Sequence, residues 1–214
     1  HKTSAVQLLA DTDITRNISA RTQPMPIELS AIAAGSGGFV INGQARGDKS
    51  GISVSAAGDV NGDGLADLLI GSYGRTNATN TTFPGSSYVV FGQTGTTAVN
   101  LNSLTAGYTI QGGTSDTSSG YSVSNAGDVN GDGFDDVLLG SFSSAGAAYV
   151  VYGGLSNSGV AADSMASSVG YKITGKANSY LGSSISGAGD VNGDGFLDLA
   201  AAGAWIRSPA NPRT

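Results

Sequence analysis

Short apolar runs alternate along this chain with stretches rich in Gly, Ser, Asn and Asp. The runs consist mainly of Val, Ile, Leu and Tyr, as in DLLIG (67–71) and YVVFG (88–92). Runs of this length and composition between turn-forming residues are typical of β-strands. Several runs show no polar–apolar alternation, which is expected of strands buried on both faces. No segment has a convincing helical periodicity, so the pattern predicts an all-β protein.

The runs recur in a fixed order around one unchanged octapeptide. AGDVNGDG occurs at 57–64, 126–133 and 188–195, at a spacing of about 60 to 70 residues, which indicates internal repeats. Each unit offers four candidate strands, and four strands in a unit of this length is the pattern of a β-propeller blade. A parallel β-helix has tandem nine-residue repeats instead, and real strands separate the repeats here. The matching flanking runs are GFVING (38–43), GYTIQG (107–112) and GYKITG (170–175) upstream, and GSSYVVFG (85–92) and GAAYVVYG (146–153) downstream.

The repeats predict β-propeller blades of four antiparallel strands, with the last blade incomplete. The third unit lacks a YVVFG-type strand. Propellers usually close with four to eight blades, so the ring is not expected to close from this chain alone. The exposed sheet edges would need the remaining blades of a longer parent chain or a homo-oligomeric assembly. The predicted organisation is a linker or edge segment at 1–25, blade repeats at 26–96 and 97–157, a truncated blade repeat at 158–205, and a tail at 206–214.

Each octapeptide opens a nine-residue loop of the form D-x-N-x-D-G-x-x-D. Positions 1, 3, 5 and 9 offer side-chain oxygens, position 7 offers a backbone carbonyl, and the glycine at position 6 can adopt the positive φ needed to wrap a cation. An all-oxygen set in a flexible loop favours Ca²⁺ over Mg²⁺ or a transition metal. The predicted ligands are Asp59, Asn61, Asp63, Leu65 and Asp67 in the first loop, Asp128, Asn130, Asp132, Phe134 and Asp136 in the second, and Asp190, Asn192, Asp194, Phe196 and Asp198 in the third.

Two other interpretations of the loop fit less well. An EF-hand requires a bidentate Glu at position 12 and flanking helices, whereas position 12 here is Ile70, Leu139 or Ala201. Turns rich in Asp, Asn and Gly also form ordinary hairpins without any metal. Three unchanged octapeptides in register, each followed by a position-9 aspartate, favour calcium over that simpler explanation.

The charge distribution agrees with a ligand role for the acidic residues. Of sixteen Asp and Glu residues, ten lie in the three loops, namely nine predicted ligands and Asp135. Three divalent cations would offset the net charge of −6, and this acidity opposes nucleic-acid binding. The chain has no cysteine, which excludes disulfides and thiolate metal sites, and no apolar run long enough to span a membrane. It begins His1-Lys2-Thr3 without a signal peptide, so a processed or excerpted piece is expected.

The repeat resembles the FG-GAP repeat of integrin α-subunit propellers and their bacterial relatives. The residues that carry the resemblance are GDVNGDGLAD (58–67), GDVNGDGFDD (127–136) and GDVNGDGFLD (189–198), within a region of about 26–205. It implies a propeller with Ca²⁺ on the hairpin loops of one face, in an extracellular or cell-surface protein with adhesion or ligand-binding roles. The family usually forms a seven-bladed ring, and its GAP-like element is only loosely kept here as GSYG (71–74) and GSFSSAG (140–146). No ligand specificity is therefore transferred.

The expected function is a calcium-bearing extracellular scaffold for binding or cell adhesion, in which Ca²⁺ is structural and the ligand is a protein or a carbohydrate. An accessory propeller of a larger secreted hydrolase is the alternative, and a fragment without independent function is a third possibility. Catalysis finds little support, since the only histidine is His1 and no P-loop or GxGxxG fingerprint occurs. Asp135 beside Asp136 could suggest a glycosidase pair, but Asp136 is a predicted ligand and Asp135 is expected to be a solvated loop residue.

Three smaller motifs receive little weight. Arg46-Gly47-Asp48 spells RGD, which a variable loop in a Gly-rich chain produces by chance. Sequons at Asn17, Asn77 and Asn80 matter only in a eukaryotic secretory pathway. Trp205 and the tyrosines could line a carbohydrate site, although aromatic residues on strands more often pack.

Overall fold

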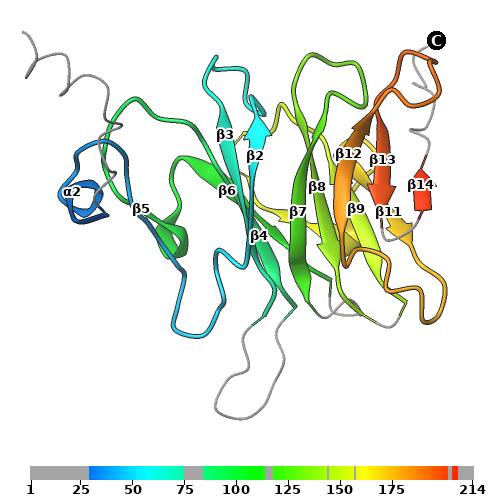
Figure 1. Cartoon of the computed structure of the whole chain (residues 1–214), viewed down its shortest axis with the longest axis horizontal. Helices are drawn as coiled ribbons and strands as arrows, with labels where there is room; N and C mark the ends of the chain where they lie inside the picture. The colour runs from blue at the N-terminus through cyan, green and yellow to red at the C-terminus, as the bar shows by residue number, and fades with distance from the viewer. Residues whose placement is uncertain are drawn as a thin grey trace, which may run out of the picture.

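The computed structural model describes residues 29–74, 84–113, 118–143, 145–156, 158–201 and 204–206. Its regular structure is almost entirely β. Three sheets lie side by side in an open row (Figure 1), and a fourth sheet has only two short strands. The exceptions in the described residues are a five-residue helix α2 (Leu29–Ala33) and two 3₁₀ turns, at Leu101–Ser103 and Ala162–Ser164. The all-β prediction is confirmed, while these short helical turns were not predicted because they are too brief to show periodicity.

The first two sheets each contain four antiparallel strands in meander order, as predicted for propeller blades. The third sheet contains β12 (Ile185–Gly189), β13 (Asp198–Ala201) and β14 (Ala204–Ile206). Although no YVVFG-type strand was predicted in the third repeat, β14 takes that place by pairing with β13. The antiparallel strands of the first sheet are β2 (Ser53–Gly58), β3 (Asp67–Ser72), β4 (Ser86–Val90) and β6 (Gly107–Gln111), and a short fifth strand adds to β6 in parallel. The second sheet is β7 (Ser119–Gly127), β8 (Asp136–Ser141), β9 (Ala147–Val151) and β11 (Gly170–Thr174).

The hydrogen-bonded sheets are offset by one strand from the sequence repeats. Strand β6 opens the second repeat, yet it pairs with β4 of the first, placing Thr109 opposite Tyr88. In the same register β11 opens the third repeat and pairs with β9, placing Lys172 opposite Tyr149. Each of the first two sheets therefore takes its fourth antiparallel strand from the following repeat.

A second, shorter link joins neighbouring repeats. The two-residue strand β10 (Val160–Ala161) runs parallel to β6, and β5 (Val99–Asn100) runs parallel to β1 (Ile41–Asn42) in the equivalent way. The registers correspond, since Val160 lies opposite Ile110 and Val99 lies opposite Ile41. This agreement confirms that GFVING and GYTIQG are equivalent segments.

The hydrophobic core lies between the sheets rather than within any one of them. Leu69 and Val89 of the first sheet pack with Val137, Leu139 and Tyr149 of the second. Every residue of β8 and β9 is buried. The absence of alternation predicted burial on both faces for β3 and β4, which is confirmed for Tyr88 to Val90 of β4 but is wrong for Leu68 of β3, which is 37% exposed. A smaller cluster joins the second sheet to the third through residues such as Val129, Leu138 and Leu199.

The outer face of the first sheet lacks the cover that the second sheet has. Val54 is 68% exposed, whereas Val123, at the same position of the second sheet, is 7% exposed because the first sheet covers it. An apolar groove of about 390 Å³ follows this face and includes Val54, Leu68 and Ile70. The faces that pack between blades are therefore apolar even where no described residue covers them.

Candidate metal-binding loops

The three predicted loops connect β2 to β3, β7 to β8 and β12 to β13, and all three lie at the same edge of the row (Figure 1). A register shift ends each inner strand just before its loop, at Gly58, Gly127 and Gly189. These glycines have φ of +79°, +66° and +72°, which residues with a Cβ rarely adopt. The bulge therefore turns the chain into the loop in the same way three times.

The aspartate at position 1 organises the first half of each loop. In the first copy Asp59 accepts hydrogen bonds from the backbone N–H groups of Gly62 (2.8 Å), Asp63 (3.1 Å) and Gly64 (2.9 Å). Asp128 and Asp190 accept the three equivalent bonds at 2.7, 3.1 and 2.9 Å. The turn is thus closed around one carboxylate, which holds the loop in a ring-like shape.

Positions 3 and 5 extend this arrangement. The amide oxygen of Asn61 accepts from the Asp63 N–H at 2.9 Å, and Asp63 Oδ1 accepts from the Leu65 N–H at 2.8 Å. The same two bonds occur in the second and third loops. Oxygens at positions 1, 3 and 5 are consequently fixed relative to one another by the backbone of the same turn.

The position-9 aspartate is the most buried polar residue of each loop. Asp67 is fully buried, and its two oxygens accept from the N–H groups of Val60 (3.0 Å) and Gly92 (2.7 Å). Asp136 accepts equivalently from Val129 and Gly153, both at 2.8 Å. Asp198 is also fully buried and accepts from Val191 at 3.0 Å. The bonds from Gly92 and Gly153 tie the first two loops to their own blades, and the bonds from Val60, Val129 and Val191 close all three loops.

The pKa values show the electrostatic cost of placing carboxylates here. Burial raises the pKa of Asp67, and the charges of Asp63 and Asp59 raise it further. Two backbone hydrogen bonds lower this pKa, but they do not cancel the rise. Burial raises the pKa of Asp136 to about 7, with Asp132 and Asp128 contributing in the same direction. A cation near these groups would stabilise their ionised forms, because an opposite charge favours the charged state.

The donor chemistry fits a hard cation, but the carboxylates are not drawn together. Within the described part of the chain, no group of three or more His, Cys, Asp or Glu side chains is arranged to hold a metal ion. In each loop, carboxylate oxygens accept hydrogen bonds from backbone N–H groups of the loop or its blade. Binding calcium would therefore require the side chains at positions 1, 5 and 9 to converge.

Asp135 is not the solvated loop residue that was expected. Its carboxylate is half-buried and accepts a hydrogen bond from the backbone N–H of Asp59 in the preceding loop at 2.8 Å. Leu197 occupies the same position of the third loop and lies against Gly127 of the second. The interpretation was wrong because position 8 points to the neighbouring blade, which no single loop sequence reveals.

The RGD tripeptide is not presented as a free recognition element. Asp48 is buried, and its carboxylate accepts hydrogen bonds from the Ala45 N–H (2.9 Å), the Ser50 N–H (3.0 Å) and the Ser50 hydroxyl (2.8 Å). Burial alone would raise the pKa of Asp48, but these bonds outweigh it and the pKa is lowered. The carboxylate stabilises its own turn.

Other sequence features lie outside the described residues. They are the segment 1–25, the three sequons at Asn17, Asn77 and Asn80, the tail beyond Ile206, and the side chain of Trp205. Among the described residues, no helix has the length and apolar character needed to cross a membrane.

Comparison with known proteins agrees with the repeat and its blades. The FG-GAP repeat family matches residues 50–90 and 119–151, which include the first two loops and their flanking strands. The chain contains FG-GAP repeats. Integrin alpha-3 of Cricetulus griseus is 31% identical over 151 residues, which is 69% of this chain and 13% of that protein. The FG-GAP chain therefore spans only a small part of the length of this relative.

These comparisons bear on the general class of the protein. FG-GAP repeats form propeller blades, in agreement with the antiparallel sheets seen here. Together with the likeness to integrin alpha-3, they place the chain among proteins with FG-GAP repeats of the integrin alpha kind. The third loop lies outside the matched residues, and its equivalence rests on the octapeptide and on the same hydrogen bonds around Asp190.

Proposed function

We propose that this chain is a calcium-stabilised propeller segment that acts outside the cell as a scaffold for binding or adhesion. The observation that carries the proposal is the threefold repetition of one loop geometry. In each copy the position-1 carboxylate gathers three backbone N–H groups, while buried and exposed oxygens lie around the same turn. An ordinary hairpin turn needs no buried aspartate at its end, whereas a calcium loop needs such an oxygen to complete its ligand set.

Each ion would be held by side chains at positions 1, 3, 5 and 9 and by the backbone carbonyl at position 7. Calcium supplies a positive charge at a hairpin where several carboxylates repel one another. The chain's own residues shape the loop. Asp59, Asp128 and Asp190 gather the N–H groups of the turn, while Asp67, Asp136 and Asp198 close the loop by accepting from its second residue. The role is structural, since nothing in this arrangement activates a water molecule or a substrate.

The expected affinity points to an extracellular location. Loops of this kind in extracellular modules bind with a Kd of about 10⁻⁴ to 10⁻³ M. At millimolar calcium and a Kd of about 0.1 mM, each site adds roughly 1.4 kcal/mol to the free energy of unfolding, or about 4 kcal/mol for three sites. Such sites fill outside the cell, and the likeness to integrin alpha-3 supports a cell-surface setting and an adhesion role.

Thermal unfolding in millimolar CaCl₂ and in EGTA tests this proposal. For a domain of this size, a loss of about 4 kcal/mol should lower Tm by roughly 8 to 16 °C. The variant with Asp59, Asp128 and Asp190 all changed to Ala should melt low in both conditions, because it lacks the residue that shapes each loop. Calorimetric titration should give three calcium ions per chain.

The matched control is Asp163→Asn, which removes an aspartate that pairs with Lys172 outside the loops. It should keep the full calcium-dependent rise in Tm. Identical melting curves of the wild type in CaCl₂ and EGTA would contradict the calcium proposal. A shift of the same size with MgCl₂ would contradict its selectivity.

A further inference from the structure

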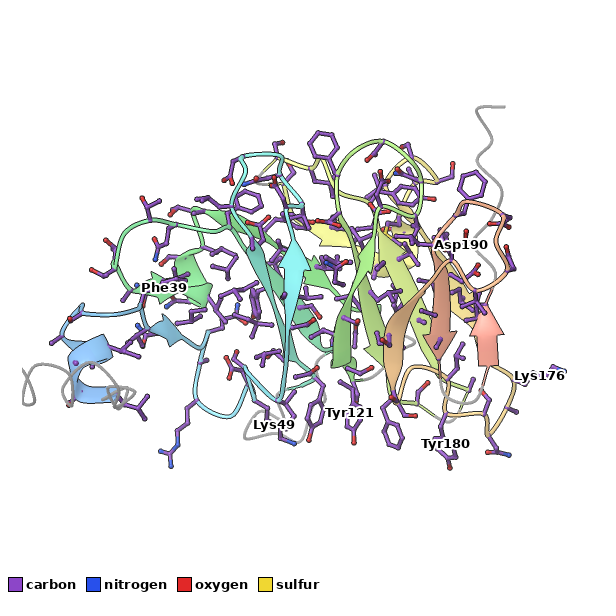
Figure 2. The ribbon with its side chains drawn as sticks, turned by 45° about the horizontal axis from the view of Figure 1, so that its top comes forward. Phe39, Lys49, Tyr121, Lys176, Tyr180 and Asp190 are labelled. Carbon is purple, nitrogen blue, oxygen red and sulfur yellow. The ribbon has the colours of Figure 1, made fainter. Side chains whose placement is uncertain are left out.

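A continuous row of side chains crosses all three blades at the edge opposite the loops. Figure 2 shows Lys49, Tyr121 and Tyr180 along this edge, with Asp190 toward the other. Lys49 donates a hydrogen bond to the Tyr73 hydroxyl at 2.7 Å and lies 4.3 Å from the centre of that ring. We call Lys49, Tyr73, Tyr121, Phe142 and Tyr180 the aromatic row; its successive ring centroids lie 5.3, 4.9 and 5.5 Å apart.

The aromatic row is open to solvent. Tyr121, Phe142 and Tyr180 are 37%, 40% and 46% exposed. Isolated apolar residues on a surface need no explanation, but contiguous apolar patches on soluble proteins are often functional. Tyrosines in particular give a large, rigid contact area at a low entropic cost, and tyrosine is enriched among the residues that dominate protein interfaces.

The ends of the row are held in a strained backbone conformation. Lys49, Ser118 and Tyr180 occupy the same position of the repeat, two residues before Gly51, Gly120 and Gly182, and their φ values are +58°, +79° and +52°. This conformation costs a residue with a Cβ about 1–2 kcal/mol in conformational energy, whereas glycine adopts it without this cost. Non-glycine residues held there cluster at functional sites. At two of the three positions the side chain extends the aromatic row.

Cations accompany the row, and they are separated from the acidic loops. Arg46 lies in the same turn as Lys49, and Lys176 lies in the same turn as Tyr180 (Figure 2). The only other cation in the described part of the chain, Lys172, pairs with Asp163 at 3.0 Å. Asp48, the nearby acid of the Arg46 turn, is buried and bonded to Ala45 and Ser50. Among the described residues, this edge therefore presents positive charge.

The geometry of the stacked rings limits the classes of ligand that the aromatic row can bind. Tyr121 and Phe142 stack at an interplanar angle of 24°, and Phe142 and Tyr180 at 21°. Centroids about 5 Å apart leave no room for a base or a sugar ring between them, and the stacking covers ring faces that a sugar would use. The exposed ring edges carry partial positive charge, which attracts carboxylates and carbonyl oxygens.

We propose that the aromatic row and its flanking cations bind an extended acidic peptide segment of a partner protein. Charge complementarity favours this occupant, because anionic side chains would meet Lys49 and Lys176 at the two ends while apolar groups cover the rings. The inference rests on the scaffold part of the proposed function and names its binding surface. It does not depend on calcium in the loops.

Fluorescence anisotropy with a labelled peptide of alternating Glu and Tyr tests the proposal. The wild type in CaCl₂ should bind with a Kd below about 0.1 mM at low salt, and binding should weaken as salt rises. The variant Tyr121→Ser/Phe142→Ser should lose at least about tenfold in affinity, since stacked aromatic anchors dominate such interfaces. Lys49→Gln should lose about threefold, whereas the matched control Lys172→Gln should bind like the wild type.

Several outcomes would overturn this inference. They are equal binding by the double variant, equal binding of a Lys-Tyr peptide, or no binding of the Glu-Tyr peptide. Tighter, row-dependent binding of heparin would replace the peptide with a polysaccharide. Circular dichroism checks that the double variant folds, and Lys49→Gln, at a partly exposed site, provides a second test. Melting in EGTA reports on the loops separately, so a failure of either proposal can be recognised.

Discussion

The two edges of the blades differ in how far they repeat: the loop edge is the same in all three blades, and the opposite edge differs from blade to blade. At the loop edge the same side chains make the same hydrogen bonds three times, as around Asp59, Asp128 and Asp190. At the opposite edge, the equivalent positions hold Lys49, Ser118 and Tyr180. Most hydrogen bonds of a loop fall within the loop, so the same loop sequence can form the same hydrogen bonds in every blade. Residues of the aromatic row contact different neighbours in adjacent blades, so each position needs its own side chain.

The largest effect should come from the charge confined at the loop edge. Because burial raises the pKa of Asp136 from 3.8 to about 7, the folded state keeps a proton that the unfolded state releases within this pH window. In EGTA, the free energy of unfolding should fall as pH rises from about 4 to 7, by up to roughly 1.4 kcal/mol per pH unit. Chemical denaturation at several pH values measures this slope.

Calcium should remove the decline, because an adjacent cation stabilises the ionised carboxylate. Asp136→Asn should reduce the decline in EGTA as well, since the amide does not titrate, and should leave the contribution of Asp67, whose pKa is also raised. A wild-type profile in EGTA that is flat between these pH values would mean that the buried carboxylate is not under electrostatic stress. The two edges would then differ in their shape and not in the electrostatic cost of their charged groups.

A smaller effect should come from the contact between neighbouring loops. Gly58 and Gly189 share a positive φ and the same repeat position, but a Cβ on Gly58 would collide with the Asp135 carboxylate, whereas one on Gly189 meets nothing within 4 Å. Gly58→Ala should therefore destabilise the protein by about 1–2 kcal/mol more than Gly189→Ala, through the lost hydrogen bond from Asp59 to Asp135. Urea denaturation of both variants provides the comparison. Equal losses would show that the loops are independent of one another.

The smallest effect, and one of opposite sign, is expected at the aromatic row. Lys49→Gly relieves the strain of a φ of +58° and loses an exposed hydrogen bond and the ammonium–ring contact with Tyr73, so stability should stay level or rise by up to about 1 kcal/mol. Binding of the acidic peptide should weaken in the same variant. A clear loss of stability on urea denaturation would indicate that Lys49 supports the fold rather than a ligand.

Periodicity in the sequence predicts the blades and the loops. Identical octapeptides identify the loop edge because its hydrogen bonds are local. The unbroken apolar runs predict buried strands, which is right for most of β4 but wrong for Leu68 of β3. The offset of sheets from repeats, the role of Asp135 and the aromatic row were not predicted. Each of these depends on contacts between blades, such as Tyr121 with Tyr73, which join residues far apart in sequence. Aligning the repeats shows that Tyr73 and Phe142 occupy the same repeat position. It does not show that Tyr121 lies between them and contacts both rings.

The one-strand offset has a consequence for how this protein is made. A ribosome delivers the chain from its N-terminus, so β2, β3 and β4 emerge well before β6 (Gly107–Gln111), which closes the same sheet. Until then the edge of β4 is an unpaired template that can recruit the wrong strand. The first and second sheets can therefore be completed only after the beginning of the next repeat has been synthesised. During synthesis, the most recently made sheet has an unpaired edge strand.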